Sequence, residues 1–175
     1  MREFVAVDVG PEEAGGRRLA ASHLTLRFLG EVPPERNGAI AARLGDVARE
    51  SPPFVLRLEG VGAFPNPARP RVVWVGVTEG RQEVTELARR VRVALAEEFG
   101  PETEEFVPHL TLFRVRSPMD RTAAAELLSG TRPALPPRDV AVDQLLLKES
   151  VLGSRGAVHR TIASFRLTGS PSVPA

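Results

Sequence analysis

The stretch His23-Leu24-Thr25-Leu26 occurs a second time in this chain, as His109-Leu110-Thr111-Leu112. The sequence contains three histidines, and two of them lie in these copies. Residues i and i+2 of a strand point to the same face, so each copy would place an imidazole beside a hydroxyl and its leucines on the opposite face. The repeat therefore predicts two similar strands, each packed on a core through one face and polar on the other.

The rest of the chain alternates between strand-like and helix-like patterns. Segments rich in Val, Leu, Ile or Phe and bounded by Gly, Pro or Ser predict strands over residues 4–9, 22–29, 54–61, 71–77, 108–116, 140–151 and 158–167. Helical spacing or capping residues predict helices over residues 35–50, 79–99 and 117–130. A long hairpin is expected over residues 148–160. Several connections are too short for parallel crossovers, which favours an α+β fold with antiparallel sheets flanked by helices.

The duplicated motif suggests that these elements form two pseudo-symmetric lobes. We expect one bilobal domain over residues 1–168, followed by a disordered tail over residues 169–175. One lobe would carry His23 and the other His109. Ligand sites are common in clefts of this kind, so the active site is expected between the lobes.

Composition limits the classes of function. The chain has 175 residues, of which 42% are hydrophobic and 26% charged, as in an ordinary soluble domain. The absence of cysteine excludes disulfides, thiolate metal sites and a cysteine nucleophile. A net charge of +1 argues against coating of long nucleic acid but is compatible with binding of an RNA end. The opening residues lack a signal-peptide pattern and no apolar run approaches membrane-spanning length, so we expect a cytoplasmic protein with no membrane partner.

The two copies carry groups suited to phosphate chemistry. Histidine has a reference pKa of about 6.5 and can act as acid or base at neutral pH. Two histidines on opposite sides of a phosphorus could open a strained cyclic phosphate, while threonine hydroxyls donate to its non-bridging oxygens. The sequence has no residue cluster with metal-ligand spacing and no glycine-rich nucleotide loop. We therefore predict that no metal and no cofactor are needed.

The sequences His-Leu-Thr-Leu-Arg-Phe-Leu-Gly (23–30) and Phe-Val-Pro-His-Leu-Thr-Leu-Phe-Arg (106–114) resemble the paired signatures of the 2H phosphoesterases. Among these, the chain is most similar to the RNA 2′,3′-cyclic phosphodiesterase (2′-5′ RNA ligase) branch. The resemblance covers nearly the whole chain. It implies two antiparallel lobes related by pseudo-twofold symmetry, with the active site between them.

The resemblance also implies a role for five residues. His23 would be the acid that protonates the O3′ leaving group, and His109 the base that activates water. Thr25 and Thr111 would hold the phosphate, and Arg114 would contact the substrate. Arg114 lies five residues after His109, which is the wrong parity for the same strand face, so a β-bulge or a strand end would be needed there.

One departure from the family concerns residues 9–22, which include several glycines and leave room for one or two helical turns where family members have a longer helix. The wall of the cleft beside His23 is therefore expected to be more open than in the family. Outside the motifs, Phe28 and Trp74 are expected in the core and His159 in a structural or cleft-edge position. Arg27 is left open between a substrate contact and a structural role.

We expect a metal-independent enzyme that opens RNA 2′,3′-cyclic phosphate ends, acts as a monomer and has tRNA fragments among its possible substrates. The same site could join a 5′-hydroxyl to the cyclic phosphate without ATP, giving a 2′-5′ linkage. Two alternatives remain: a phosphodiesterase of small cyclic nucleotides or 2′-5′ oligoadenylates, and a non-catalytic module that binds RNA ends. Intact histidines in both motifs argue against the non-catalytic module.

Overall fold

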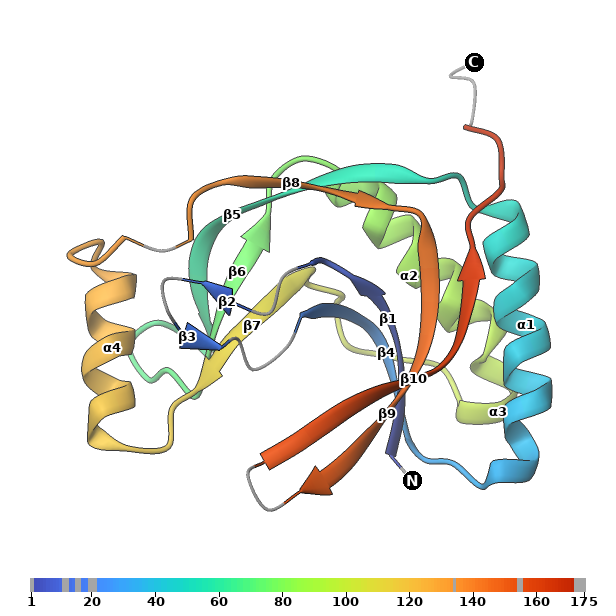
Figure 1. Ribbon diagram of the computed structural model, residues 1–175, viewed down its shortest axis with the longest axis horizontal. Coiled ribbons are helices and arrows are strands. Elements are labelled where there is room, and N and C mark those ends of the chain that lie inside the picture. The colour runs from blue at the N-terminus through green and yellow to red at the C-terminus, as the bar shows by residue number, and fades with distance from the viewer. Residues whose placement is uncertain are drawn as a thin grey trace.

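Two four-stranded antiparallel sheets, one in each lobe, form the framework of the molecule (Figure 1). The computed structural model describes residues 2–10, 13–14, 17–18, 22–133, 135–153 and 156–171. The strands of the first sheet are, in spatial order, β10 (Gly156–Arg166), β9 (Gln144–Gly153), β1 (Arg2–Asp8) and β4 (His23–Glu31). Those of the second sheet are β7 (His109–Arg114), β6 (Val72–Val77), β5 (Phe54–Phe64) and β8 (Arg138–Val142).

Helices pack on the two sheets and on each other. They are the 3₁₀ turn η1 (Pro34–Arg36) and the α-helices α1 (Asn37–Glu50), α2 (Arg81–Ala94), α3 (Ala96–Phe99) and α4 (Pro118–Leu128). Helix α1 contacts β9, β10 and α2, whereas α2 contacts β4 and β5. Helix α4 lies apart from them, on the other side of the second lobe, and contacts β5 (Figure 1). The predicted α+β class with antiparallel sheets is confirmed.

The two motif strands occupy equivalent places. Strand β4 is an edge strand of the first sheet, β7 is an edge strand of the second, and the two edges contact each other. The leucines of both motifs lie in a continuous core with residues of α1 and α2: Leu24, Leu26, Leu110, Leu112, Ile40, Leu44, Val84 and Leu87. The alternation of apolar and polar faces predicted from the repeat is therefore correct.

Two predicted elements are divided in the structure. The strand expected over residues 140–151 is two strands, because the chain leaves β8 of the second sheet and enters β9 of the first. The helix expected over residues 79–99 is interrupted at Leu95, whose φ of −103° and ψ of 2° depart from α-helical values, and continues as the short α3. The predicted hairpin is confirmed, since β9 and β10 pair in antiparallel register.

The start of α4 lies where the capping pattern at Ser117 predicts it. Ser117 Oγ accepts from the backbone N–H of Asp120 at 3.1 Å, and the Asp120 carboxylate accepts from the Ser117 N–H at 2.9 Å. This reciprocal capping box is fixed by neighbours in the sequence.

The connection between β1 and β4 and the C-terminal tail are described only in part. The connection holds the short strands β2 (Glu13–Ala14) and β3 (Arg17–Arg18), which pair with each other. In the predicted tail, the Gly169 N–H donates to the Ser51 carbonyl at 3.0 Å. Residues 172–175 and the hairpin residues 154–155 lie outside the described residues.

Candidate active site

A cavity of about 520 Å³ lies where β4 and β7 approach each other. Thr25 and Phe28 line it from β4, His109 from β7 and Phe64 from the end of β5, and residues 101–107 form much of the remaining wall. Thr25 of the first copy and His109 of the second therefore line one cavity, between the lobes, whereas His23, Thr111 and Arg114 are not among the residues that line it. His23 precedes Thr25 by two residues and lies on the same face of β4.

The first motif histidine is almost fully enclosed. The side chain of His23 is 8% exposed, and its ring centroid lies 4.8 Å from that of Phe4 and 4.9 Å from that of His159. Burial lowers the pKa of His23 to about 3, and the neighbouring charges of His159 and Lys148 act in the same direction. In the free protein His23 is therefore neutral at neutral pH.

The second motif histidine is held in one orientation. His109 Nδ1 lies 2.7 Å from the carbonyl oxygen of Val107. A carbonyl can only accept, so Nδ1 carries the proton and Nε2 of the neutral ring keeps the free lone pair. Burial lowers the pKa of His109, and the hydrogen bond to Val107 raises it. This arrangement prepares Nε2 to accept a proton.

Aromatic rings support His109 from the second sheet. The Phe64 ring meets it edge-on at 4.9 Å between centroids, and the Trp74 ring lies 6.0 Å away. A Cβ atom at Gly62 would lie 2.2 Å from the Trp74 ring, so only glycine lets that ring lie across β5. Trp74 was expected in the core. The structure instead places it on the same face as His109.

A bulge in β7 decides where Arg114 points. Thr111 pairs with Trp74, and Arg114 pairs with Val72, two residues away along β6. Three steps on β7 thus match two on β6, which is the signature of a β-bulge. Because Trp74 and Val72 share one face of β6, the bulge returns Arg114 to the face of Thr111. The irregularity that the parity of Arg114 required is present.

The first motif strand has the same irregularity. Thr25 pairs with Ala6 and Phe28 pairs with Phe4, so three steps on β4 match two on β1. Phe28 is therefore the structural counterpart of Arg114. Its side chain is 70% exposed and lines the cavity, so the expectation that it belongs to the core was wrong. The physical reason is the bulge, which turns this position towards the cleft.

Arg27 has a structural role. Its side chain is 2% exposed, and its guanidinium donates to the carbonyls of Arg92 and Gly100, each at 2.7 Å. Glu102 lies 3.9 Å from its Nε. These contacts fasten the segment after α3 to β4.

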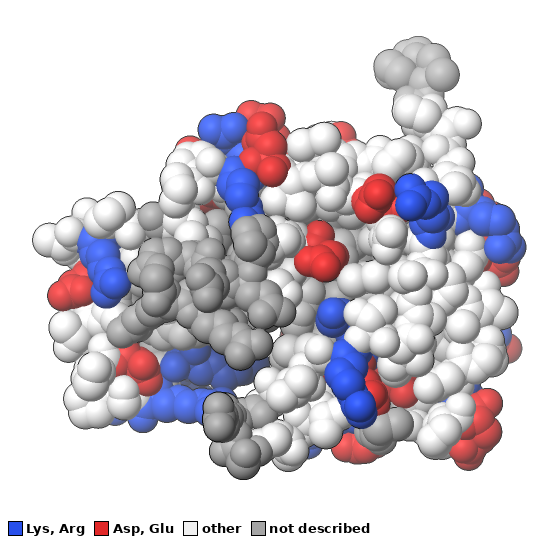
Figure 2. Space-filling model, viewed as in Figure 1, with Lys and Arg blue, Asp and Glu red and all other residues white. Residues whose placement is uncertain are grey.

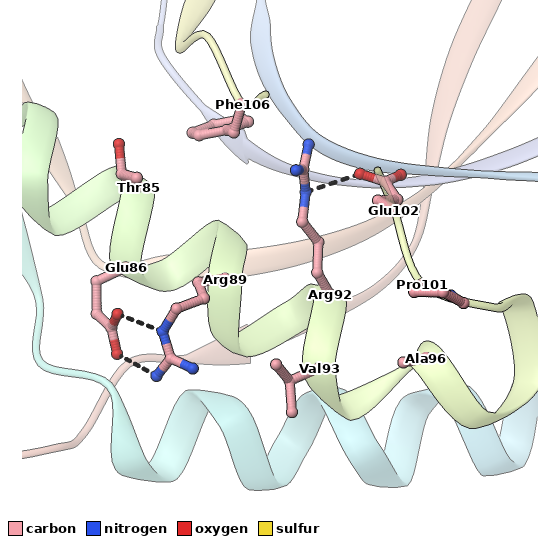
Figure 3. Close-up of a pocket in the computed structure, with 9 residues that line it drawn as sticks. All are labelled: Thr85, Glu86, Arg89, Arg92, Val93, Ala96, Pro101, Glu102 and Phe106. Carbon is pink, nitrogen blue, oxygen red and sulfur yellow. Dashed lines mark hydrogen bonds and ion pairs between the residues drawn. The ribbon is translucent and has the colours of Figure 1, made fainter. Parts of the chain in front are cut away.

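A second cavity, of about 400 Å³, lies on the α2 side of that segment (Figure 3). Arg92 stands between Phe106 and Glu102 there: its Nε is 2.7 Å from Glu102, and its guanidinium carbon is 5.2 Å from the Phe106 ring centroid. Arg92 also donates to the Glu104 carbonyl at 3.0 Å. The charged side chains that line this cavity form ion pairs, Arg89 with Glu86 and Arg92 with Glu102. The contacts of Arg92 hold the segment that leads to Val107, whose carbonyl oxygen accepts the hydrogen bond from His109.

The third histidine was expected in a structural or cleft-edge position, and the structure places it against His23. The ring of His159 meets that of His23 at 82°. The sequence contained a signal for this, because His159-Arg160-Thr161 repeats the His-x-Thr spacing of the two motifs. The lysine of β9, Lys148, donates to Thr161 Oγ1 at 3.2 Å and is 9% exposed.

The described residues also bear on metal binding and membrane insertion. Among them, no three His, Cys, Asp or Glu side chains are grouped so that they could hold a metal ion. No helix in that part of the chain is long and apolar enough to cross a membrane.

Comparison with known proteins places these features in a family. Residues 12–151 match the model of the 2′-5′ RNA ligase superfamily. An RNA 2′,3′-cyclic phosphodiesterase of Aeropyrum pernix is 37% identical over 86% of this chain and 85% of that protein. One of Archaeoglobus fulgidus is 37% identical over 94% of this chain and 99% of that protein.

Solved structures match as well. The crystal structure of a Thermus thermophilus protein matches with a TM-score of 0.74 and 30% identity, over 98% of this chain and all of that one. Escherichia coli LigT with bound 3′-AMP matches with a TM-score of 0.69 and 27% identity, over 95% and 98%. The chain therefore belongs to the 2′-5′ RNA ligase superfamily.

Proposed function

We propose that this protein hydrolyses RNA 2′,3′-cyclic phosphate ends to 2′-phosphomonoesters without a metal ion. The observation that carries the proposal is the meeting of the two motifs in one cavity, with Thr25 and His109 in its wall. The relatives described above, at 37% identity, are named RNA 2′,3′-cyclic phosphodiesterases.

In this proposal His109 is the general base and His23 the general acid. Nε2 of His109 takes a proton from water while the water oxygen forms a bond to phosphorus. The bond between phosphorus and O3′ breaks, and His23 gives its proton to O3′. The phosphate remains on O2′. The hydrogen bond from Nδ1 to Val107 supports the base role because it leaves Nε2 unprotonated and fixed in direction.

The phosphate itself would supply the charge that the acid needs. Burial and two neighbouring basic groups keep His23 neutral in the free protein, whereas a general acid must carry a proton. A bound phosphate anion beside the imidazole favours the protonated form. We therefore place proton uptake by His23 after substrate binding.

Thr25 and Thr111 would donate hydrogen bonds to the non-bridging oxygens, where negative charge is concentrated. Arg114 lies on the Thr111 face and has no ion pair within the described residues. Its backbone neighbours include Arg71, whose carbonyl accepts from the Val115 N–H at 2.9 Å. Figure 2 shows Lys and Arg side chains beside the end of β7. This basic surface supports contacts with RNA phosphates.

The same geometry allows ligation. If the 5′-hydroxyl of a second RNA replaces water, Nε2 of His109 takes the hydroxyl proton while the oxygen bonds to phosphorus. The bond between phosphorus and O3′ breaks, O3′ leaves with a proton from His23, and a 2′-5′ linkage forms without ATP. We also propose that the protein acts as a monomer, because one chain supplies both motifs. We further propose that it acts in the cytoplasm, with tRNA fragments among its substrates.

The test is hydrolysis of a short RNA ending in 2′,3′-cyclic phosphate, in the presence of EDTA, with identification of the product isomer. The expected product carries a 2′-phosphate. His23→Ala and His109→Ala should each lower turnover by about 10²- to 10⁴-fold, and the double variant should be hardly worse than either one. Binding of the RNA end without turnover would favour the non-catalytic module, and faster turnover of 2′,3′-cyclic mononucleotides or 2′-5′ oligoadenylates would favour a small-nucleotide enzyme.

A further inference from the structure

The first sheet contains a buried cation, Lys148, for which the described residues supply no counter-ion. The Lys148 side chain, in the middle of β9, is 9% exposed. Its ammonium donates to Thr161 Oγ1 at 3.2 Å, and within the described residues it forms no ion pair. Burying an ammonium without an anion is unfavourable. A lysine in this setting is therefore expected to meet an anion that comes from outside the protein.

A second unsatisfied group lies beside it. Nδ1 of His159 is buried and has no hydrogen-bond partner in the part of the chain that the structure describes. The ring centroid of His159 lies 5.3 Å from that of Phe4 and 4.9 Å from that of His23. In the register of the sheet, Lys148 is opposite Phe4 on β1 and Thr161 on β10. Lys148, His159 and Thr161 thus offer an ammonium, an imidazole nitrogen and a hydroxyl on the face of the sheet that carries Phe4.

The nearby carboxylates cannot serve this face. Glu149 follows Lys148 in β9, so it points to the opposite face of the strand, where it forms an ion pair with Arg160 at 2.8 Å. Glu3 pairs with Glu149 across the sheet and lies on that same opposite face. Among the described residues, no carboxylate forms an ion pair with the Lys148 ammonium on the Phe4 face.

The position of these groups separates them from the reacting phosphate. The reacting phosphate would lie between β4 and β7, whereas β9 and β10 lie on the other side of β1 from β4. His23 stands between the two places, since its ring contacts both Phe4 and His159. An anion bound by Lys148, His159 and Thr161 would be a second one, on the far side of His23 from His109.

We propose that Lys148, His159 and Thr161 form a phosphate subsite for the internucleotide phosphate that precedes the cyclic end of the RNA. This inference rests on the proposed function, because it takes the cyclic phosphate as the reacting group. The subsite would make the enzyme prefer an RNA strand to a mononucleotide, and it would set the direction in which the strand leaves the cleft.

The test compares two dinucleotides that both end in 2′,3′-cyclic phosphate. One has a normal phosphodiester between its nucleotides and the other an uncharged methylphosphonate. A hydrogen bond to a charged group corresponds to roughly 10- to 100-fold in binding. We expect the wild-type protein to prefer the charged dinucleotide by about that factor in kcat/KM, and Lys148→Met to lose this preference, so that its kcat/KM values for the two dinucleotides become similar.

Three controls define the origin of the effect. Lys148→Arg keeps the charge and is expected to keep most of the preference. His159→Phe keeps a ring against His23 but removes the nitrogen, so it should reduce the preference only in part. The melting temperature of Lys148→Met should not fall, because the substitution removes an unpaired buried charge.

The outcomes separate the subsite from the proposed function. If the wild-type protein turns over neither dinucleotide, the proposed function fails. If it turns over both equally well, or if Lys148→Met slows both equally, the function stands and the subsite is refuted. Failure of both Lys148→Met and Lys148→Gln to fold would show that the lysine is structural and would overturn the proposal.

Discussion

Acid should destabilise this protein through His23, and His23→Gln should remove that sensitivity. The pKa of His23 is about 3 in the folded protein and about 6.5 in an unfolded chain. Below pH 6.5 the unfolded chain takes up a proton that the folded protein does not, so the free energy of unfolding falls as the pH falls. For one proton, the free energy of unfolding falls by about 1.4 kcal/mol per pH unit between the two pKa values. His23 alone therefore lowers the free energy of unfolding by about 2 kcal/mol at pH 5 and by about 4 to 5 kcal/mol near pH 3. A typical domain has only about 5–15 kcal/mol of stability in total.

The measurement is urea unfolding of the wild-type protein and His23→Gln between pH 7.5 and 5, where few carboxylates titrate. His109 and His159 also have lowered pKa values because of burial, so both proteins should lose stability, but the variant should lose about 2 kcal/mol less. Thr25→Ala is the control, since it lies on the same face and does not titrate. Inorganic phosphate should narrow the difference by stabilising protonated His23. Parallel pH profiles for wild type and His23→Gln would refute the burial argument.

Four further outcomes follow from the site. Burial lowers the pKa of both motif histidines, so the pH profile of kcat/KM should be bell-shaped with its optimum below pH 6.5. The optimum of kcat should lie at a higher pH, because the bound phosphate raises the pKa of His23. An optimum of kcat/KM above pH 7 would contradict this prediction. Thr25→Ala and Thr111→Ala should each lower kcat by roughly 10- to 10³-fold, Thr→Ser should be milder, and full activity of either Thr→Val would remove the hydroxyls from the phosphate site. Arg114→Ala should reduce the slope of log affinity against log salt by about 0.7. Arg166 is exposed and ion-paired, so Arg166→Ala should leave the slope unchanged. Equal slopes for the wild-type protein and both variants would exclude a phosphate contact by Arg114. Arg27→Met should cost about 3–5 kcal/mol of stability, since it leaves two buried carbonyls and Glu102 without their partner. A loss below about 1 kcal/mol in urea unfolding would show that Arg27 does not hold the segment after α3.

The two motif strands and the chemistry they carry could be predicted from the sequence because they depend on local rules. Alternation along a strand put Leu24 and Leu110 in the core and His23 and His109 on the opposite faces. The capping pattern at Ser117 likewise predicted the start of α4, since both hydrogen bonds of the capping box join residues three apart. These features needed no information about distant parts of the chain.

Only the tertiary structure decided what surrounds each histidine. The core position expected for Phe28 was wrong, and the role of Arg27 could not be decided, because a bulge exists only relative to a partner strand, here β1. The contacts of His23 with Phe4 and His159 join three strands whose order in the sheet no local pattern reveals. Neighbours along the chain determine the face on which a side chain lies, whereas its pKa, its ion pairs and its access to the cleft depend on strands that folding brings together from distant parts of the sequence.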